Sequence, residues 1–194
     1  MYVRCIKPAL DWLVAFLALL LLMPLLLAIA LALVVTTGAS PLFRQARIGL
    51  HGRIFYLLKF RSMTNARGPD GTLRPDSDRI TPLGYWLRRT SLDELPQLMN
   101  VLMGQMSLVG PRPLLAEYDS AVGRYPRHQT RPGLTGWAQV HGRNALSWNE
   151  KFALDAWYVA NRCFWVDCQI LWRTLPVLLD TSPPAQRLLS DEDR

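Results

Sequence analysis

The chain begins with a long apolar stretch and then changes to an ordinary mixture of polar and apolar positions. Residues 12–35 form 24 consecutive positions without a charge. A run longer than ~18 apolar residues is typical of a membrane-embedded segment, so the pattern argues against a purely soluble enzyme. Pro24 lies in the middle of the run, where it removes a backbone hydrogen bond. Two arrangements are consistent with this: a kinked spanning helix, or a re-entrant hairpin that breaks at Met23–Pro24.

The flanks of the apolar run distinguish these alternatives. Arg4 and Lys7 precede it, and further arginines follow it from position 44 onward. Basic flanks prefer the cytoplasmic side of a membrane, and a chain that is basic on both sides favours the hairpin. A signal peptide is disfavoured because its apolar core is only 7–15 residues long. Asp11 lies one helical turn after Lys7, so it either pairs with this lysine or forms a solvated flank.

The following region changes to alternating positions. Two short runs, 43–48 and 54–60, flank Gly49-Leu-His-Gly52 and predict a β-hairpin. Residues 65–79 are polar and rich in Gly, Pro and Asp, as in a surface loop. Helical spacing then predicts helices over 80–90 and 91–103, and a short helix over 115–125.

The last third contains a glycine-rich loop, 131–144, and two amphipathic helices, 147–162 and 164–180. Four tryptophans on these helices belong either at a lipid interface or in the core. The pattern therefore predicts a small membrane-associated α/β fold that is mainly helical. We expect a helix-break-helix anchor over 1–40, a catalytic domain over 41–180 and a polar tail over 181–194.

Charge and composition narrow the function classes. The formal charge is +7, and the basic excess lies between residues 44 and 143, which points to anionic ligands or anionic lipid. Most of the basic residues are arginines, which suit phosphate binding, although a GC-rich genome produces the same bias. Three cysteines are too few for a disulfide framework and fit a reducing compartment. No Walker A or G-x-G-x-x-G sequence occurs, and we expect no nucleic-acid partner.

Asp93 and Glu94 are the strongest candidates for chemistry. Adjacent acids can serve as a nucleophile with an acid/base partner, or as metal ligands. The alternative is structural, because Ser91-x-x-Glu94 matches a capping box. Pro96 either begins the following helix, leaving the acids in the entering turn, or bends its first turn.

Several basic residues are candidates for phosphate binding. Lys59 and Arg61 alternate along the second predicted strand and either bind phosphate or form a solvated face. Arg112 lies between two prolines that restrict the backbone, which lowers the entropy lost when it binds an anion. Residues of the glycine-rich loop are candidates for a nucleotide or sugar pocket: Arg131, Gln139 and Arg143.

The strings FRQARIGLHGRIFYLLKFRSM, RTSLDELPQLMNVLMGQMSLVGPRPL and RPGLTGWAQVHGRN closely resemble the bacterial sugar transferase family, the monotopic phosphoglycosyl transferases. The resemblance runs from about residue 7 to 180. Because no long N-terminal extension is present, the chain resembles the minimal, PglC-like form. Met23 departs from the family, which often has Ser before this proline; a Ser hydroxyl can bond to a carbonyl that the proline frees, and Met cannot.

The resemblance implies transfer of a sugar 1-phosphate from a UDP-sugar donor to polyprenyl (undecaprenyl) phosphate, with release of UMP and dependence on Mg2+. In this family the reaction passes through a covalent enzyme intermediate. By position, Asp93 is the implied nucleophile and metal contact, and Glu94 its dyad partner. The implied phosphate ligands are Lys59 and Arg112, with Arg88, Arg131 and Arg143 as weaker assignments.

The resemblance further implies a monotopic protein of the bacterial inner membrane, with its catalytic domain facing the cytoplasm and downstream glycosyltransferases as partners. N-acetylated sugars fit the short form best, and galactose or glucose is also compatible with it. Two rival functions are a phosphotransferase acting on another lipid phosphate and a non-catalytic scaffold that binds anionic lipid.

Overall fold

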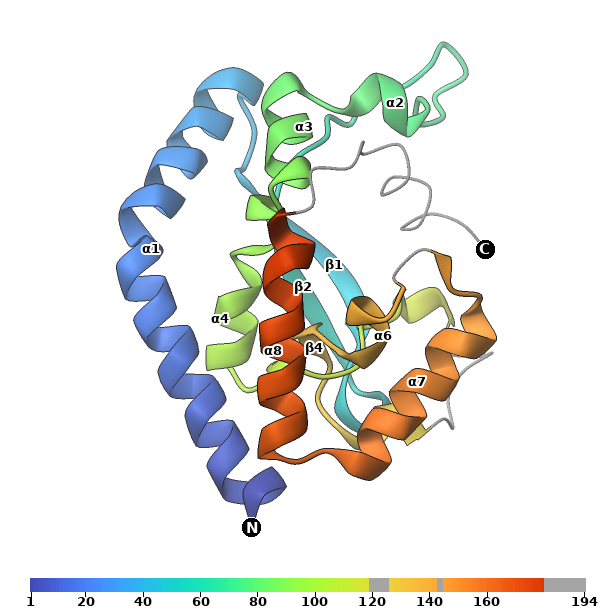
Figure 1. The fold of residues 1–194 in the computed structure, drawn as a ribbon. Helices are drawn as coiled ribbons and strands as arrows, with labels where there is room; N and C mark the ends of the chain where they lie inside the picture. Colours follow the sequence, from blue (N-terminus) through green and yellow to red (C-terminus); the bar gives the residue numbers. More distant parts are fainter. Residues whose placement is uncertain (119–125, 143–144, 180–194) are drawn as a thin grey trace.

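The computed structural model describes residues 1–118, 126–142 and 145–179 (Figure 1). This part is mainly helical and contains two short two-stranded sheets. The long helix α1 (Lys7–Thr37), preceded by the π-helical turn η1 (Tyr2–Ile6), lies along one side of the molecule. The predicted fold class, mainly helical with a short β-hairpin, is confirmed.

Helix α1 is continuous, in contrast to the predicted helix-break-helix. It passes through Pro24 without interruption and ends at Gly38, whose left-handed conformation caps it. Ala15 before the proline and Leu33 after it are both fully buried, so both halves pack against the same body. This packing outweighs the hydrogen bond that Pro24 removes. Figure 1 shows the result as one curved helix, and the membrane topology stays a prediction.

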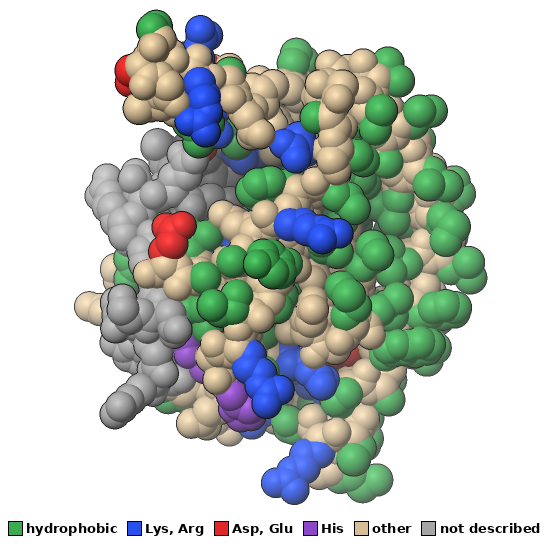
Figure 2. Space-filling view, turned by 180° about the vertical axis from the view of Figure 1, so that it is seen from behind, with side chains coloured by type: hydrophobic (Ala, Val, Ile, Leu, Met, Phe, Trp, Pro, Cys, Tyr) green, Lys and Arg blue, Asp and Glu red, His purple; other side chains and the backbone are tan. Residues whose placement is uncertain are grey.

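The outer face of α1 is apolar and exposed. Leu21 and Val35 are 78% and 76% exposed, and Figure 2 shows hydrophobic side chains gathered along the edge that α1 forms. By length and composition alone, Tyr2–Thr37 is the one helix in the described residues that could cross a membrane.

The predicted β-hairpin is confirmed. Strands β1 (Leu42–Ile48) and β2 (Ile54–Phe60) pair in antiparallel register, with Leu42 opposite Phe60. A 3-10 turn, η2 (Leu50–Gly52), joins them. Phe55 and Leu57 of β2 are buried in one cluster with Leu98 and Val101, so the hairpin packs against the helix that contains the last two residues.

The predicted helix over 80–90 is α3 (Pro82–Arg89), which follows the short α2 (Asp76–Arg79). The single helix predicted over 91–103 is wrong. Its residues divide into a 3-10 turn, η3 (Leu92–Glu94), and helix α4 (Gln97–Leu102). The division follows from Ser91, which is left-handed (φ 57°), and from Pro96, which forms the N-cap of α4.

The remaining strands and short helices lie between α4 and the C-terminal helices. Strand β3 (Ser107–Val109) pairs in parallel with β4 (Gly133–Thr135). Only one turn of the helix predicted over 115–125, η4 (Ala116–Tyr118), lies in the described residues. The turn η5 (Pro126–Gln129) precedes β4, and α6 (Trp137–Val140) follows it within the predicted loop.

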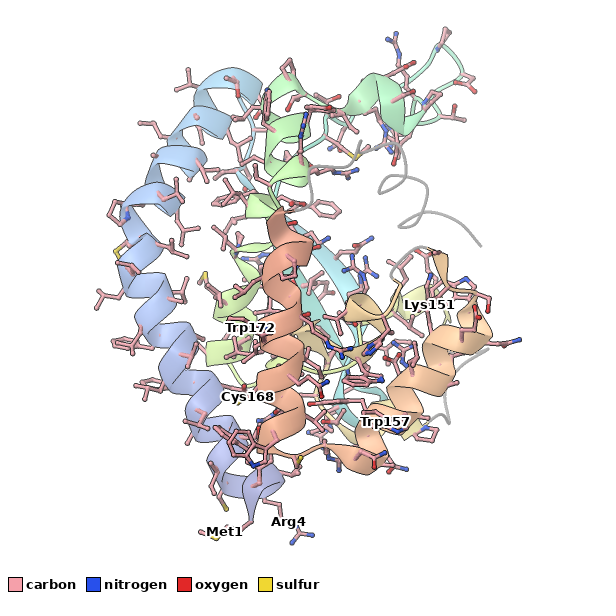
Figure 3. The ribbon with its side chains drawn as sticks, in the orientation of Figure 1. Met1, Arg4, Lys151, Trp157, Cys168 and Trp172 are labelled. Atoms are coloured by element: carbon pink, nitrogen blue, oxygen red, sulfur yellow. The ribbon has the colours of Figure 1, made fainter. Side chains whose placement is uncertain are left out.

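Helices α7 (Trp148–Asn161) and α8 (Phe164–Leu179) match the two predicted amphipathic helices. Their tryptophans are mostly exposed. Trp157 of α7 stacks on Trp137 with ring centroids 4.4 Å apart but is still 41% exposed, and Trp165 and Trp172 of α8 are 77% and 75% exposed. Figure 3 shows Trp157 and Trp172 on these different helices.

A buried polar network joins the start of α1 to α8. The Lys7 ammonium lies 2.7 Å from a carboxylate oxygen of Asp167 and 3.7 Å from one of Asp11, which confirms the predicted Lys7–Asp11 pair. The Tyr158 hydroxyl donates to Asp167 at 2.7 Å, and Ser107 donates to Asp11. Figure 3 shows this end of α1, with Met1 and Arg4, beside the first turns of α8.

Candidate active site

The acidic pair lies in a tight turn between α3 and α4. Ser91 adopts positive φ, which residues other than glycine do only at a cost, and the turn η3 follows directly. Asp93 is 7% exposed. The Ser91 side chain makes no capping hydrogen bond, so the predicted capping box is absent. Backbone strain of the kind seen at Ser91 is characteristic of functional turns.

Two cations from distant segments converge on Glu94. Lys59, near the end of β2, places its Nζ 3.1 Å from Glu94 Oε1. Arg112 places Nη2 3.6 Å from the same oxygen. One carboxylate oxygen of Glu94 thus lies between two cations and beside the buried Asp93. The structure therefore brings Lys59 and Arg112, both predicted phosphate ligands, together at Glu94.

Asn100 fixes the acidic turn relative to Lys59. Asn100 is fully buried, and it belongs to α4, the helix that follows the acidic turn. Its Oδ1 accepts from the Leu58 N–H at 3.0 Å, and its Nδ2 donates to the Tyr56 carbonyl at 2.8 Å. Helix α4 is therefore hydrogen-bonded to the edge of β2 one residue before Lys59.

Arg88 approaches the same strand end from α3. Its Nε donates to Ser62 Oγ at 2.9 Å, and its Nη2 lies 2.8 Å from the Met63 sulfur. Gly84 allows this approach, because a Cβ there would lie 1.9 Å from the Ser62 carbonyl oxygen. Arg61 makes a different contact: its Nε donates to the Ser40 carbonyl at 2.9 Å, so the structure does not bring it to Glu94 with Lys59.

The residues predicted in the glycine-rich loop have different environments. Arg131 is partly buried, and its Nη2 lies near Gly104 after α4. The side-chain amide of Gln139 on α6 is buried, and neither of its polar atoms has a hydrogen-bond partner in the part of the chain that the structure describes. Buried amides are almost always paired, which is consistent with a ligand contact. Arg143 lies outside the described residues.

The acidic turn suits a magnesium ion by its donor type. Among the described residues no group of three or more His, Cys, Asp and Glu side chains forms a protein-only metal cluster. Mg2+ is, however, commonly held by one or two carboxylates together with substrate phosphates. Asp93 and Glu94 supply two adjacent carboxylates of this kind.

Sequence reasoning missed the buried polar residues that hold the site together. Asn100 had a visible signal, since it is a polar residue within the apolar run LMNVLM. Arg47, Arg127 and Asp155 are also buried, but their partners are far away in the sequence and no local pattern marks them.

Comparisons with known proteins are consistent across almost the whole chain. The family model described as bacterial sugar transferase matches residues 2–181. The sugar transferase EpsL of Bacillus subtilis is 51% identical over 144 residues, which are 73% of this chain and 71% of that protein. A UDP-glucose:undecaprenyl-phosphate glucose-1-phosphate transferase of Caulobacter vibrioides is 43% identical over 187 residues, 90% of this chain and 70% of that protein.

Some relatives are much longer. A sugar transferase of Haemophilus influenzae is 40% identical over 198 residues, which cover 91% of this chain but 41% of that protein. The chain therefore corresponds to less than half of such a relative.

Proposed function

Because the chain belongs to the bacterial sugar transferase family, we propose that it transfers a sugar 1-phosphate from a UDP-sugar to polyprenyl phosphate. The carrying observation is the convergence of Lys59 and Arg112 on Glu94, next to the buried Asp93. This arrangement combines a carboxylate nucleophile with cations that neutralise phosphate oxygens. The name of the Caulobacter relative supports both the donor and the acceptor class.

In the first step, a carboxylate oxygen of Asp93 attacks the phosphorus next to the sugar. The new bond joins this oxygen to phosphorus, the bond to the bridging oxygen of the diphosphate breaks, and UMP leaves with the electron pair. In the second step a phosphate oxygen of the polyprenyl phosphate attacks the same phosphorus, and the Asp93 carboxylate is released. The products are UMP and polyprenyl-diphosphate-sugar.

The neighbouring residues have distinct roles in this scheme. Lys59 and Arg112 exchange their contact with Glu94 for contacts to the diphosphate oxygens and so orient the phosphorus towards Asp93. Arg88, held against Ser62, and the buried Gln139 amide are further substrate contacts. Asp93 and Glu94 would hold Mg2+, which supplies neutralisation of phosphate charge when bound.

The test is release of UMP from a panel of UDP-sugars with undecaprenyl phosphate and Mg2+. The panel includes the glucose, galactose and N-acetylated sugars. Wild-type protein should release UMP with one or a few donors and, without acceptor, should gain the mass of one sugar phosphate. Asp93→Asn should do neither, whereas Asp78→Asn, an exposed control in α2, should behave as wild type.

Three outcomes would contradict the proposal. Turnover by Asp93→Asn at the wild-type rate would exclude Asp93 as the nucleophile. Folded, membrane-bound wild type that releases no UMP from any donor would favour the scaffold that binds anionic lipid, and release of another product would favour a different lipid-phosphate phosphotransferase.

The proposed location is the cytoplasmic face of the bacterial inner membrane, with α1 in the lipid. The exposed apolar face of α1 and the exposed Trp165 and Trp172 support membrane contact. Reporters at the N-terminus and after Arg47 should both lie in the cytoplasm if α1 enters and leaves by one leaflet. Reporters on opposite sides would show a span.

A further inference from the structure

Two buried arginines outside the acidic turn hold the backbone that presents Arg112. Arg127 on η5 donates from Nη2 to the Arg112 carbonyl. Arg47 on β1 donates from Nη1 to the next carbonyl, that of Pro113, at 3.1 Å. Arg127 and Arg47 are only 5% and 8% exposed. The same segment extends the Arg112 side chain towards Glu94.

Helix α7 fixes Arg127 in turn. Asp155 Oδ2 lies 3.2 Å from Arg127 Nη2, and the Phe152 ring centroid lies 5.1 Å from the centre of the guanidinium. Burial raises the pKa of Asp155 to about 6 although Arg127 opposes this, and burial also lowers the pKa of Arg127. A pair whose desolvation exceeds its attraction adds little to stability, so stability alone does not account for it.

We propose that Arg127 is a positioning residue for Arg112, and that the Asp155–Arg127–Arg112 carbonyl chain sets where the Arg112 guanidinium meets the donor diphosphate. This inference rests on the proposed function for its substrate class. It adds a role for α7, which contributes no residue to the acidic turn itself.

The orientation of the Arg112 carbonyl affects the position of the Arg112 guanidinium. Pro111 and Pro113 restrict the backbone on both sides of Arg112, so the two bonded carbonyls fix most of the remaining freedom of the segment. The guanidinium lies at the end of a long side chain, so a small rotation of this peptide displaces it. A misplacement of about 1 Å at a reacting site can cost about 100-fold in rate.

The test is a double-mutant cycle that combines Arg127→Lys with Arg112→Gln. The readouts are kcat and KM for the UDP-sugar, and the dissociation constant for inorganic pyrophosphate without metal. A single nitrogen, Arg127 Nη2, contacts both Asp155 and the Arg112 carbonyl. Lysine keeps the positive charge beside Asp155, but its ammonium lies at the end of a flexible stem and lacks the rigid plane that holds this nitrogen between the two partners. With Arg112 present, Arg127→Lys should lower kcat/KM about 10- to 100-fold and weaken pyrophosphate binding. In the Arg112→Gln background, Arg127→Lys should change kcat/KM and the pyrophosphate dissociation constant by less than about threefold each.

The matched control is Arg162→Lys. Arg162 also donates to a backbone carbonyl, that of Val159, at 2.8 Å, but that carbonyl belongs to the last turns of α7 and not to the Pro111–Pro113 segment. This variant should match wild type in both readouts. If Arg127→Lys does not fold, Asp155→Asn replaces it in the cycle, because it removes the charge that orients Arg127 while keeping the side-chain shape.

The outcomes separate the two ideas. An equal loss from Arg127→Lys in both Arg112 backgrounds would show a general structural role and overturn the positioning proposal. If Arg127 and Arg112 are coupled in pyrophosphate binding but the protein turns over no UDP-sugar, the positioning role stands and the proposed function is rejected. If the protein turns over a UDP-sugar but the two residues are not coupled, the proposed function stands and the positioning role is rejected.

Discussion

Replacing Glu94 with glutamine tests whether this carboxylate competes with the substrate for the two cations. Glu94 Oε1 lies 3.1 Å from Lys59 and 3.6 Å from Arg112. The Lys59 and Glu94 side chains are 14% and 26% exposed, so this pair is worth about 1–2 kcal/mol. The Arg112 side chain is 43% exposed, and solvent screening limits its pair to less than about 1 kcal/mol.

In Glu94→Gln the carboxylate charge is gone, so a diphosphate no longer has to displace it from the two cations. The binding free energy of the diphosphate should therefore become more favourable by about 1–2 kcal/mol. In EDTA and low salt, Glu94→Gln should bind UDP about 5- to 30-fold more tightly than wild type. The gain should shrink at high salt, because the cations are partly exposed. With Mg2+ and both substrates, kcat should fall, since Glu94 also serves the acidic pair.

The assay is calorimetric titration of UDP into purified protein in detergent. Glu117→Gln is the control, because Glu117 is exposed on η4, and its UDP affinity should match that of wild type. A dissociation constant for Glu94→Gln that equals or exceeds the wild-type value in EDTA would refute the competition argument.

Two further predictions concern stability. Gly84→Ala places a Cβ 1.9 Å from the Ser62 carbonyl oxygen, which forces α3 away from the strand end. We expect the free energy of unfolding to fall by about 1–3 kcal/mol and the thermal midpoint by about 2–12 °C. An unchanged midpoint would contradict the close packing. Because the folded chain raises the pKa of Asp155 from 3.8 to about 6, it binds this proton more tightly than the unfolded chain, and stability is lost as the pH rises through about 6. Between pH 5 and pH 7 the difference in unfolding free energy between wild type and Asp155→Asn should change by about 1.3 kcal/mol in this direction, and parallel pH profiles would exclude the effect.

The sequence predicts those features that depend on neighbouring residues. The β-hairpin follows from alternation around Gly49-Leu-His-Gly52, and helices α7 and α8 follow from their spacing. The pattern Ser-x-x-Glu, however, occurs at both Ser91 and Ser147. It forms a complete capping box only at Ser147, because Ser91 is left-handed. The pattern alone does not distinguish a helix cap from the strained turn at Ser91.

The remaining features depend on contacts between distant segments. The continuity of α1 reflects packing on both sides of Pro24, and no local rule for proline includes such packing. Arg47, Arg127 and Asp155, which hold the Arg112 segment, come from β1, η5 and α7. No local sequence pattern marks any of the three. Lys59 and Arg112 could be assigned to phosphate by their neighbours and by the family resemblance, but their common partner emerged only from the fold.

The network at the start of α1 has a consequence for biogenesis. Lys7 leaves the ribosome 160 residues before its partner Asp167, an interval of roughly 8 to 32 s at ordinary rates of synthesis. During that time the apolar helix has been made, but the charge at its base has only Asp11, four residues away, as a partner. The buried ion pair that fixes the start of α1 therefore forms only when α8 emerges, so a helix near the C-terminal end of the described residues completes the packing of the N-terminal one.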